Sequence, residues 1–159
     1  YTDHTLFNTT PYIEATGFNT TSHGTTVASI IAADTDRMIG VAPQATLILG
    51  SYDTQDSRTA LVNRATAHNA IAINNSWGFS TDATVANYQG LKRSNADYVS
   101  ALQRYSQTGV VVFAASNDAN RTSSTLMESL PAFDSSLRNG WIAVVSGIPS
   151  FDEQGISSV

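Results

Sequence analysis

Residues 110–115, Val-Val-Val-Phe-Ala-Ala, are an uninterrupted apolar run that begins directly after Gly109. A strand with one wet face alternates apolar and polar residues, whereas an unbroken apolar run predicts a strand buried on both faces. Three further segments predict strands, at 45–50, at 141–146 and at 71–76, the last of which ends in polar residues. Strands buried on both faces occur almost only in parallel sheets that helices cover.

Helical patterns separate these strands. Three segments place apolar residues at helical spacing: His23 to about Asp34, 56–70 and 95–107. Asp56 or Ser57 is expected to cap the second helix, and Gly109 to end the third. Residues 1–22, rich in Thr, Asn and Gly, show no periodicity and are expected to form a loop. The alternation predicts an α/β fold in three layers, with a mostly parallel sheet and helices on both faces.

The composition excludes several classes of function. Charged residues make up 13% of the chain, its net charge is -5, and no Lys/Arg cluster occurs, so no nucleic-acid partner is expected. The absence of cysteine excludes disulfides, thiolate zinc sites and a cysteine nucleophile. No apolar run approaches the roughly 18 residues that span a bilayer, so no membrane segment is expected in this chain. The polar but uncharged surface favours a secreted or cell-surface protein.

Polar residues lie at the carboxyl ends of two predicted strands. Residues 74–76 (Asn-Asn-Ser) end one strand, and residues 116–118 (Ser-Asn-Asp) follow another. Ligands bind at this edge of parallel sheets, because loops and helix N-termini converge there. His23 begins a helix, and its imidazole, which titrates near neutral pH, can present itself as a proton-transferring group at the same edge. The sequence therefore predicts one site that includes His23 and Asn117.

Several segments resemble, in the same order, those of the subtilisin-like serine proteases, the subtilases. They are His-Gly-Thr-Thr-Val-Ala at 23–28 with Ile-Ile-Ala-Ala at 30–33, Gly-Val-Ala-Pro at 40–43, Ile-Asn-Asn-Ser-Trp-Gly at 73–78, residues 109–117, Pro-Ala at 131–132 and Ile-Ala-Val at 142–144. The resemblance covers most of the chain and implies an incomplete subtilisin-like fold. It implies a serine endopeptidase, a hydrolase that cleaves an extended polypeptide substrate by an Asp/His/Ser acyl-enzyme mechanism.

The resemblance also implies roles for particular residues. His23 would be the general base, which accepts the proton of the nucleophile and returns it to the leaving amine. Asn117 would donate its side-chain amide to the oxyanion. Two segments resemble the walls of the pocket that receives the side chain before the scissile bond: Ser76, Trp77 and Gly78 form one wall, and Ala115 and Ser116 the other. Backbone in the first wall can also pair with an extended peptide.

Two members of the catalytic triad are not recognised. The family's aspartate lies in an Asp-Ser/Thr-Gly turn, and no such turn precedes His23. The family's nucleophile lies in Gly-Thr-Ser-x-Ala, and the chain contains no Gly-Thr-Ser. We expect residues 1–159 to be a partial subtilase catalytic domain truncated at both ends, with the aspartate before residue 1 and the serine after residue 159. Such a chain is expected to be inactive alone and to pair with the missing parts of its domain. Thr26 replaces a second histidine of many relatives, and Ser116 a glycine.

Other interpretations stay open. The chain could be a non-catalytic subtilase-fold module for binding or scaffolding, which Ser116 permits, or an unrelated doubly wound domain, although no glycine-rich phosphate loop follows a strand. Asn117 could simply satisfy the turn after its strand. His4 and His68 are expected to be surface or helix residues. The four aspartates within 34–56 match no ligand loop, so no metal and no cofactor is expected, although structural calcium is possible in the family.

Overall fold

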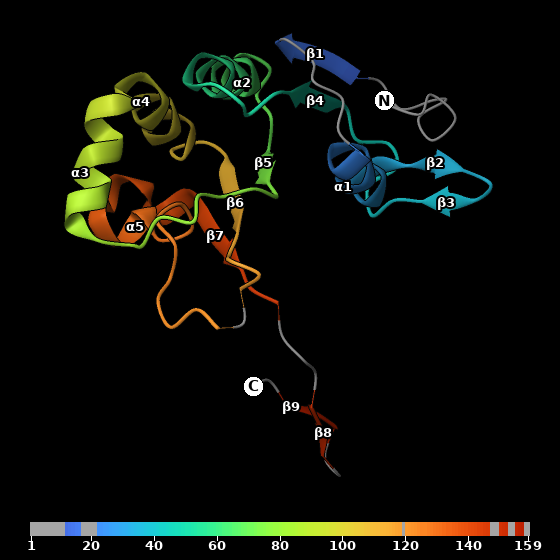
Figure 1. Cartoon of the computed structure of the whole chain (residues 1–159). Helices are drawn as coiled ribbons and strands as arrows, with labels where there is room; N and C mark the ends of the chain where they lie inside the picture. Colours follow the sequence, from blue (N-terminus) through green and yellow to red (C-terminus); the bar gives the residue numbers. More distant parts are fainter. Residues whose placement is uncertain (1–11, 17–21, 119, 147–149, 153–154, 158–159) are drawn as a thin grey trace. The chain divides into compact units, whose positions relative to one another are not determined.

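The chain folds into two compact units. The computed structural model describes residues 12–16, 22–118, 120–146, 150–152 and 155–157. Unit 1 runs from Tyr1 to Ala70 and unit 2 from Ile71 to Val159. In Figure 1 the elements coloured blue to blue-green belong to unit 1, and those coloured green to red belong to unit 2. The two units are described separately.

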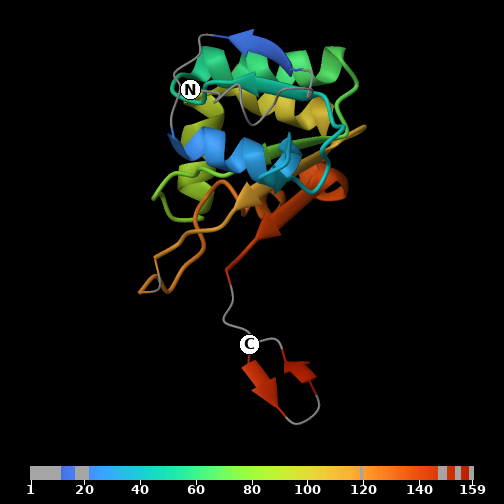
Figure 2. The ribbon, with the colours of Figure 1, turned by 90° about the vertical axis from the view of Figure 1, so that its right-hand side faces the viewer.

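Unit 1 contains a parallel pair of strands covered by a helix. β1 (Tyr12–Thr16) pairs with β4 (Leu47–Gly50), and α2 (Gln55–Ala67) packs against both strands (Figure 2). The strand predicted at 45–50 and the helix predicted at 56–70 are therefore confirmed, each with shorter bounds.

The loop predicted for residues 1–22 is wrong in part. Residues 12–16 form β1, and residue 22 already belongs to a helix. The partner of β1 lies far along the chain, so its extended backbone depends on a pairing that its own sequence does not signal. The other residues of this segment lie outside the described ranges.

Helix α1 (Ser22–Ala32) buries one face, at Ala28, Ser29 and Ala32. Ile30, by contrast, is 53% exposed. The helix ends before Asp34 because that residue pairs in a strand. Backbone amides of the following turn cap its carbonyls: those of Gly40, Val41 and Ala42 donate to the carbonyls of residues 33, 30 and 31 at 2.7, 3.0 and 2.7 Å.

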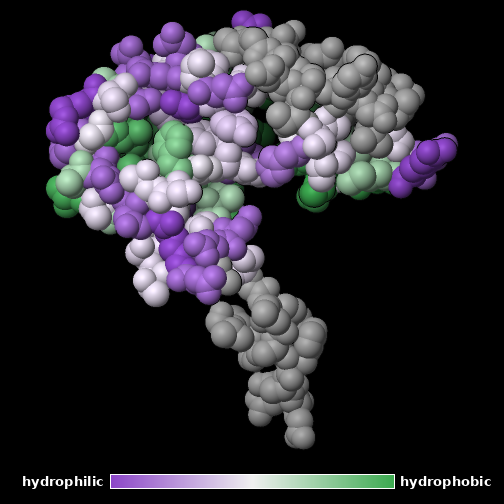
Figure 3. Space-filling model, in the orientation of Figure 1, coloured by the Kyte–Doolittle hydropathy of each residue, from purple (hydrophilic) through white to green (hydrophobic). Residues whose placement is uncertain are grey.

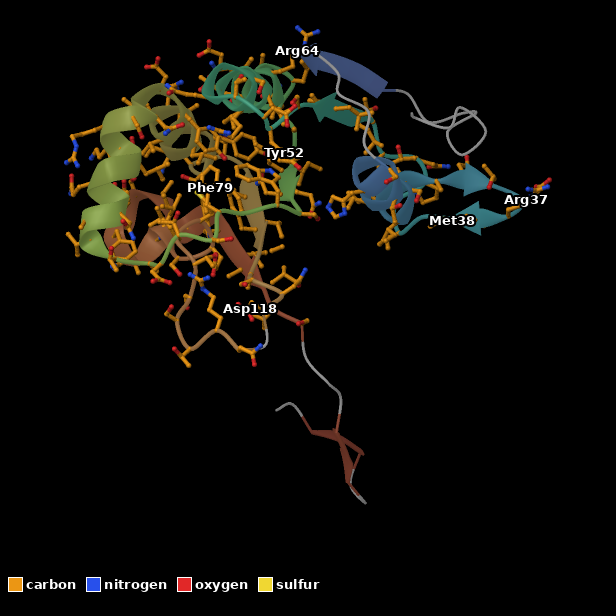
Figure 4. The ribbon with its side chains drawn as sticks, viewed as in Figure 1. Arg37, Met38, Tyr52, Arg64, Phe79 and Asp118 are labelled. Atoms are coloured by element: carbon orange, nitrogen blue, oxygen red, sulfur yellow. The ribbon has the colours of Figure 1, made fainter. Side chains whose placement is uncertain are left out.

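A short antiparallel hairpin follows α1. β2 (Asp34–Thr35) pairs with β3 (Met38–Ile39), and the Thr35 hydroxyl accepts from the Met38 amide at 3.1 Å within the turn. Arg37 stands at the tip of the hairpin, where hydrophilic surface gathers (Figure 3 and Figure 4).

The cap of α2 differs from the two residues expected. Thr54 is the N-cap, and its hydroxyl accepts from the Ser57 amide at 3.1 Å, while the Ser57 hydroxyl accepts from the Thr54 amide at 3.1 Å. This reciprocal pair is a capping box, in which Ser57 takes the third helical position rather than the cap itself. Asp56 lies in the first turn, where a negative charge suits the helix dipole.

Unit 2 is built on a parallel sheet of three strands. β6 (Val110–Ala114) lies between β5 (Ala72–Asn75) and β7 (Trp141–Val144), with Val111 beside both Ile73 and Trp141. The three strands predicted in this part of the chain are confirmed, as is the α/β class with a parallel sheet. Further along, β8 (Ser150–Asp152) and β9 (Gly155–Ser157) pair as an antiparallel hairpin.

The helices of unit 2 lie on one side of this sheet (Figure 1). They are α3 (Val85–Ser94), α4 (Ala96–Tyr105), α5 (Leu130–Phe133) and a 3₁₀ helix, η2 (Ser135–Gly140). α4 confirms the helix predicted at 95–107, and its Tyr98, Leu102 and Tyr105 are buried as their spacing predicts. α3 was not predicted. Of its residues only Tyr88 and Leu91 are buried, so its helical periodicity is weak.

Gly140 marks a close approach between η2 and the end of α4. A Cβ at this position would lie 2.6 Å from the Gly109 carbonyl oxygen and closer still to that of Ser106. Both obstacles are backbone atoms, which cannot move aside as a flexible side chain can. Gly90, in α3, has no atom within 4 Å of the corresponding position.

These two glycines form a matched pair for a stability test. Gly140→Ala is expected to destabilise the chain by about 1–3 kcal/mol because of overpacking. Gly90→Ala, the control, is expected to stabilise it by about 0.5–1 kcal/mol, since alanine loses less backbone entropy in a helix. Urea denaturation followed by circular dichroism measures both, and a neutral Gly140→Ala would contradict this packing.

A carboxyl group ties the helices of unit 2 together. Asp134, between α5 and η2, accepts from the Tyr88 hydroxyl of α3 at 2.7 Å and from the Gln103 amide of α4 at 2.8 Å. The amide and hydroxyl of Ser136 donate to its other oxygen at 3.1 and 2.6 Å. Burial alone raises the pKa of Asp134, but these donors outweigh it and lower the pKa from 3.8 to about 2. Burial, then the Asp134 hydrogen bond and charge, raise the pKa of Tyr88 to about 12.

The lowered pKa of Asp134 predicts how stability depends on pH. Its contribution is full above the ordinary pKa of 3.8 and is lost as the pH falls towards about 2, because protonation weakens the accepted hydrogen bonds. The raised pKa of Tyr88 acts at the other end: its contribution is full below pH 10 and is lost as the pH rises through about 12.

Tyr88→Phe is expected to cost about 1.5–3 kcal/mol at pH 7, the range for a hydrogen bond to a charged group. The loss is expected to shrink as the pH falls to 2, and also when Asp134→Asn is already present. Urea denaturation of the four chains of this double-mutant cycle at pH 7 and pH 2.5 measures the coupling. A cost for Tyr88→Phe that ignores both pH and residue 134 contradicts the network.

Candidate active site

Two segments leave the sheet of unit 2 at the same edge. One follows β5 after Asn75, and the other follows β6 after Ala114. Because the two strands are neighbours and parallel, their carboxyl ends lie side by side. Between the segments lies a pocket of about 190 Å³. Its lining residues are Ser76, Trp77, Gly78, Phe79, Ser80, Ala114, Ala115, Ser116, Asn117 and Thr125.

The pocket brings together six of the seven residues that the sequence singled out. They are Ser76, Trp77, Gly78, Ala115, Ser116 and Asn117. The roles assigned to them stay predictions, but the two expected walls do face one cavity. The four other lining residues, Phe79, Ser80, Ala114 and Thr125, were not predicted. The first two continue a predicted wall, whereas Thr125 had no local signal, since an isolated bridge between Asp82 and Thr125 brings it there.

Aromatic contacts fix the first wall. The Trp77 ring packs edge-on against Phe113 of β6 and against Phe79, with centroids 5.3 and 5.6 Å apart. Such edge-to-face pairs contribute about 0.5–1.5 kcal/mol each beyond the area they bury. Beneath this wall, the buried side chain of Asn75 donates to the Val112 carbonyl at 3.2 Å. Trp77 is therefore anchored to the sheet.

A set of polar contacts joins the segment after β5 to the segment after β6. The Arg121 guanidinium forms an ion pair with Asp82 and donates to the carbonyls of Ser80 and Ser123 at 3.1 and 3.0 Å. Backbone bonds lie alongside, from the Leu126 amide to the Thr81 carbonyl at 2.8 Å and from the Ala83 amide to the Ser124 carbonyl at 3.1 Å. We call these contacts the loop brace. They hold the two walls at a fixed separation.

Asn117 lies in an exposed turn directly after β6. The Asp118 amide donates to the Ser116 hydroxyl at 3.1 Å, and the Asn120 amide to the Asp118 carboxyl at 3.0 Å (Asp118 is labelled in Figure 4). The neighbouring side chains thus accept hydrogen bonds from backbone amides of the turn. Asn117 itself is exposed and lines the pocket.

His23 lies in the first turn of α1, in unit 1, and is exposed. Thr26, which replaces a histidine of many relatives, makes a hydrogen bond within the helix: its hydroxyl donates to the Ser22 carbonyl at 2.9 Å. His68 is exposed at the C-cap of α2, and His4 lies outside the described residues.

Two features are absent from the described residues. No three His, Asp or Glu side chains gather there as they would around a metal ion. No helix among the same residues has the length and apolar character needed to cross a membrane.

Unit 2 is therefore a parallel α/β unit with a pocket between two braced segments at the carboxyl edge of its sheet. The model of the Subtilase family matches residues 7–152. The chain therefore belongs to the subtilase family, a family of serine peptidases. Neither the curated proteins nor the solved structures gave a match. Family membership removes the alternative of an unrelated doubly wound domain.

The loop brace predicts a specific effect of substitution at Arg121. Arg121→Gln is expected to destabilise the chain by about 1–3 kcal/mol, mainly through the lost hydrogen bonds of a charged donor, since the exposed ion pair itself contributes little. Amide exchange at Ala83 and Leu126 is expected to accelerate. Arg37→Gln at the exposed hairpin tip is the matched control, with an expected change within about 0.5 kcal/mol. Unchanged exchange in Arg121→Gln would show that the brace does not hold the segments.

Proposed function

We propose that this chain contributes the general base and the oxyanion donor of a serine endopeptidase that cleaves extended polypeptides through an acyl-enzyme. The observation that carries the proposal is the pocket in unit 2, which Ser76–Gly78 line together with Ala115, Ser116 and Asn117, in a chain of the subtilase family. A cavity at this edge is where parallel sheets bind their ligands.

The proposed chemistry assigns one step to each residue. His23 accepts the proton of the attacking serine hydroxyl, and then returns it to the leaving amine when the acyl-enzyme forms. The Asn117 carboxamide donates to the oxygen that becomes negative in the tetrahedral intermediate. As a neutral donor it stabilises that charge without adding a competing charge. Exposure of both residues supports these roles, since each must reach a bound peptide.

The remaining triad members are proposed to come from polypeptide other than these 159 residues, which contain neither an Asp-Ser/Thr-Gly turn before His23 nor a Gly-Thr-Ser. The substrate strand is proposed to lie along the backbone of residues 76–78, and its side chain to enter the pocket. We further propose that the intact protein acts outside the cell or at its surface, in keeping with the low content of charged residues.

Substitutions in the full-length protein that contains this sequence test the proposal. Asn117→Ala is expected to lower kcat by about 10²–10³, and His23→Ala by about 10⁶, with peptide affinity changed far less; these losses are the known ones for the corresponding groups of subtilisin. Steady-state hydrolysis of a fluorogenic peptide measures both. His68→Ala, an exposed histidine outside the pocket, is the control and is expected to keep full activity.

Two further outcomes separate the alternatives. The chain of 159 residues alone is expected not to react with a fluorophosphonate probe, and labelling of any of its serines would overturn the assignment of the nucleophile to other polypeptide. A full-length protein that binds peptides without cleaving them would instead be a non-catalytic binding module.

A further inference from the structure

The second wall of the pocket separates two cavities. β6 lies between β5 and β7 in the sheet, so the segment that follows β6 runs between the segment after β5 and the end of β7. Ala115 and Ser116 of this segment line the pocket described above and also a second cavity of about 410 Å³. The second cavity reaches Ala143 of β7 and Val145, which follows that strand. Open space therefore lies on both sides of this wall.

A wall with a cavity behind it gains little support from close packing on that side. Packed side chains resist displacement because a shift loses contacts, and this restraint is weaker where a cavity adjoins. The position of the wall is therefore fixed mainly from its two ends. The sheet fixes one end, where the Ala115 amide donates to the Val144 carbonyl at 2.8 Å. The loop brace fixes the other end.

The loop brace meets the pocket at two of its lining residues, Ser80 and Thr125. The Arg121 guanidinium donates to the Ser80 carbonyl at 3.1 Å, and an isolated bridge joins Asp82 to Thr125. Ser80 and Thr125 are the lining residues that lie farthest along the chain from β5 and β6, the strands that precede them. The brace therefore joins the two segments at the part of the pocket that the sheet controls least.

Arg121 is the centre of this brace. Its side chain is 16% exposed, and its guanidinium pairs with Asp82 and donates to the Ser123 carbonyl at 3.0 Å. The Ser123 hydroxyl donates to the Asp82 carboxyl group at 2.9 Å. A planar guanidinium that meets several acceptors fixes their spacing more closely than a single hydrogen bond does. Neither Arg121 nor Asp82 lines the pocket, so the pair acts on its dimensions from outside.

We propose that Arg121 and Asp82 are positioning residues that set the width of the pocket and so determine the largest side chain that it admits. The inference rests on the proposed function, because it concerns the pocket that receives the side chain before the scissile bond. When the pair is broken, the second wall moves towards the cavity behind it and the pocket widens. A larger side chain then gains relative to a smaller one, whichever of the two the intact pocket favours.

The experiment compares two peptides that differ only in the side chain before the scissile bond, which is tryptophan in one and leucine in the other. In the full-length protein that contains this sequence, Arg121→Gln is expected to raise the tryptophan to leucine ratio of kcat/KM by about 3–10-fold. A well-shaped pocket discriminates by about 10–200-fold for one methylene group, so partial loss of shape is sufficient for this change. The ratio cancels any loss that both peptides share, such as a smaller folded fraction. An unchanged or lower ratio overturns the inference.

Three further variants show whether the effect belongs to the pair. Asp82→Ala is expected to raise the ratio by a similar factor, and the double variant with Arg121→Gln to add little, since both substitutions break the same contact. Arg121→Lys keeps the charge but not the planar fork and is expected to give an intermediate ratio. Full additivity of the two single variants contradicts a shared role. Asp82→Ala and Arg121→Lys decide the question even if Arg121→Gln does not fold.

Arg138→Gln is the matched control for a merely structural role. The Arg138 guanidinium also donates to a backbone carbonyl of unit 2, that of Pro131 at 3.1 Å, but neither of these residues lines the pocket. Arg138→Gln is expected to lower stability in urea denaturation without changing the ratio. An equal change of the ratio in Arg138→Gln and Arg121→Gln would mean that the ratio reports a general loosening of unit 2, and it would overturn the inference.

The outcomes separate failure of this inference from failure of the proposed function. Cleavage that requires His23, with a ratio that Arg121→Gln leaves unchanged, supports the function and overturns the inference. If the full-length protein cleaves no peptide, the proposed function fails, and calorimetry of acetylated peptides that end in tryptophan or leucine measures the same ratio as an affinity. A rise of that ratio in Arg121→Gln supports the inference, whereas no change, or no binding, overturns it.

Discussion

Parallel pairing of β5 with β6 is the constraint on which the pocket depends. Parallel strands end at the same edge of a sheet, so the segments after Asn75 and Ala114 emerge side by side although they are far apart in sequence. β6 is the central strand, and its Val111 and Phe113 are fully buried. A close-packed strand of this kind resists displacement, so the edge it carries is a fixed base for the residues that follow.

Loops alone would not keep such a pocket in shape. The loop brace supplies what the sheet does not: Arg121 and backbone bonds tie the segment after β6 to the segment after β5, beyond the last strand residues. Trp77 adds an apolar anchor from the same wall to Phe113. Binding residues placed on loops are useful only when a rigid scaffold positions them, and here sheet, brace and aromatic contacts do so together.

Two carboxyl groups of unit 2, those of Asp134 and Glu128, each hold neighbouring groups in place by accepting hydrogen bonds. Asp134 and Glu128 both accept hydrogen bonds from neutral donors rather than from a cation, which offsets part of the cost of removing them from water. Asp134 gathers donors from α3, α4 and η2 and so joins helices. Glu128 receives both of its side-chain bonds from Thr125 and thereby orients one hydroxyl group. In each case the acceptor-only chemistry of a carboxylate decides which way its partners point.

The sequence by itself determined the α/β class, the three strands of unit 2, the face of α4 that Tyr98, Leu102 and Tyr105 bury, and the two walls of the pocket. These follow from local patterns: an unbroken apolar run, a helical spacing, and motifs that sit at strand ends. Only the tertiary structure decided that residues 12–16 form a strand, that α3 is a helix, and that Thr125 joins the pocket. Each of these features depends on partners that are distant in the chain. Pairing between distant segments produces no periodic pattern in the sequence of either segment, so local sequence patterns cannot predict it.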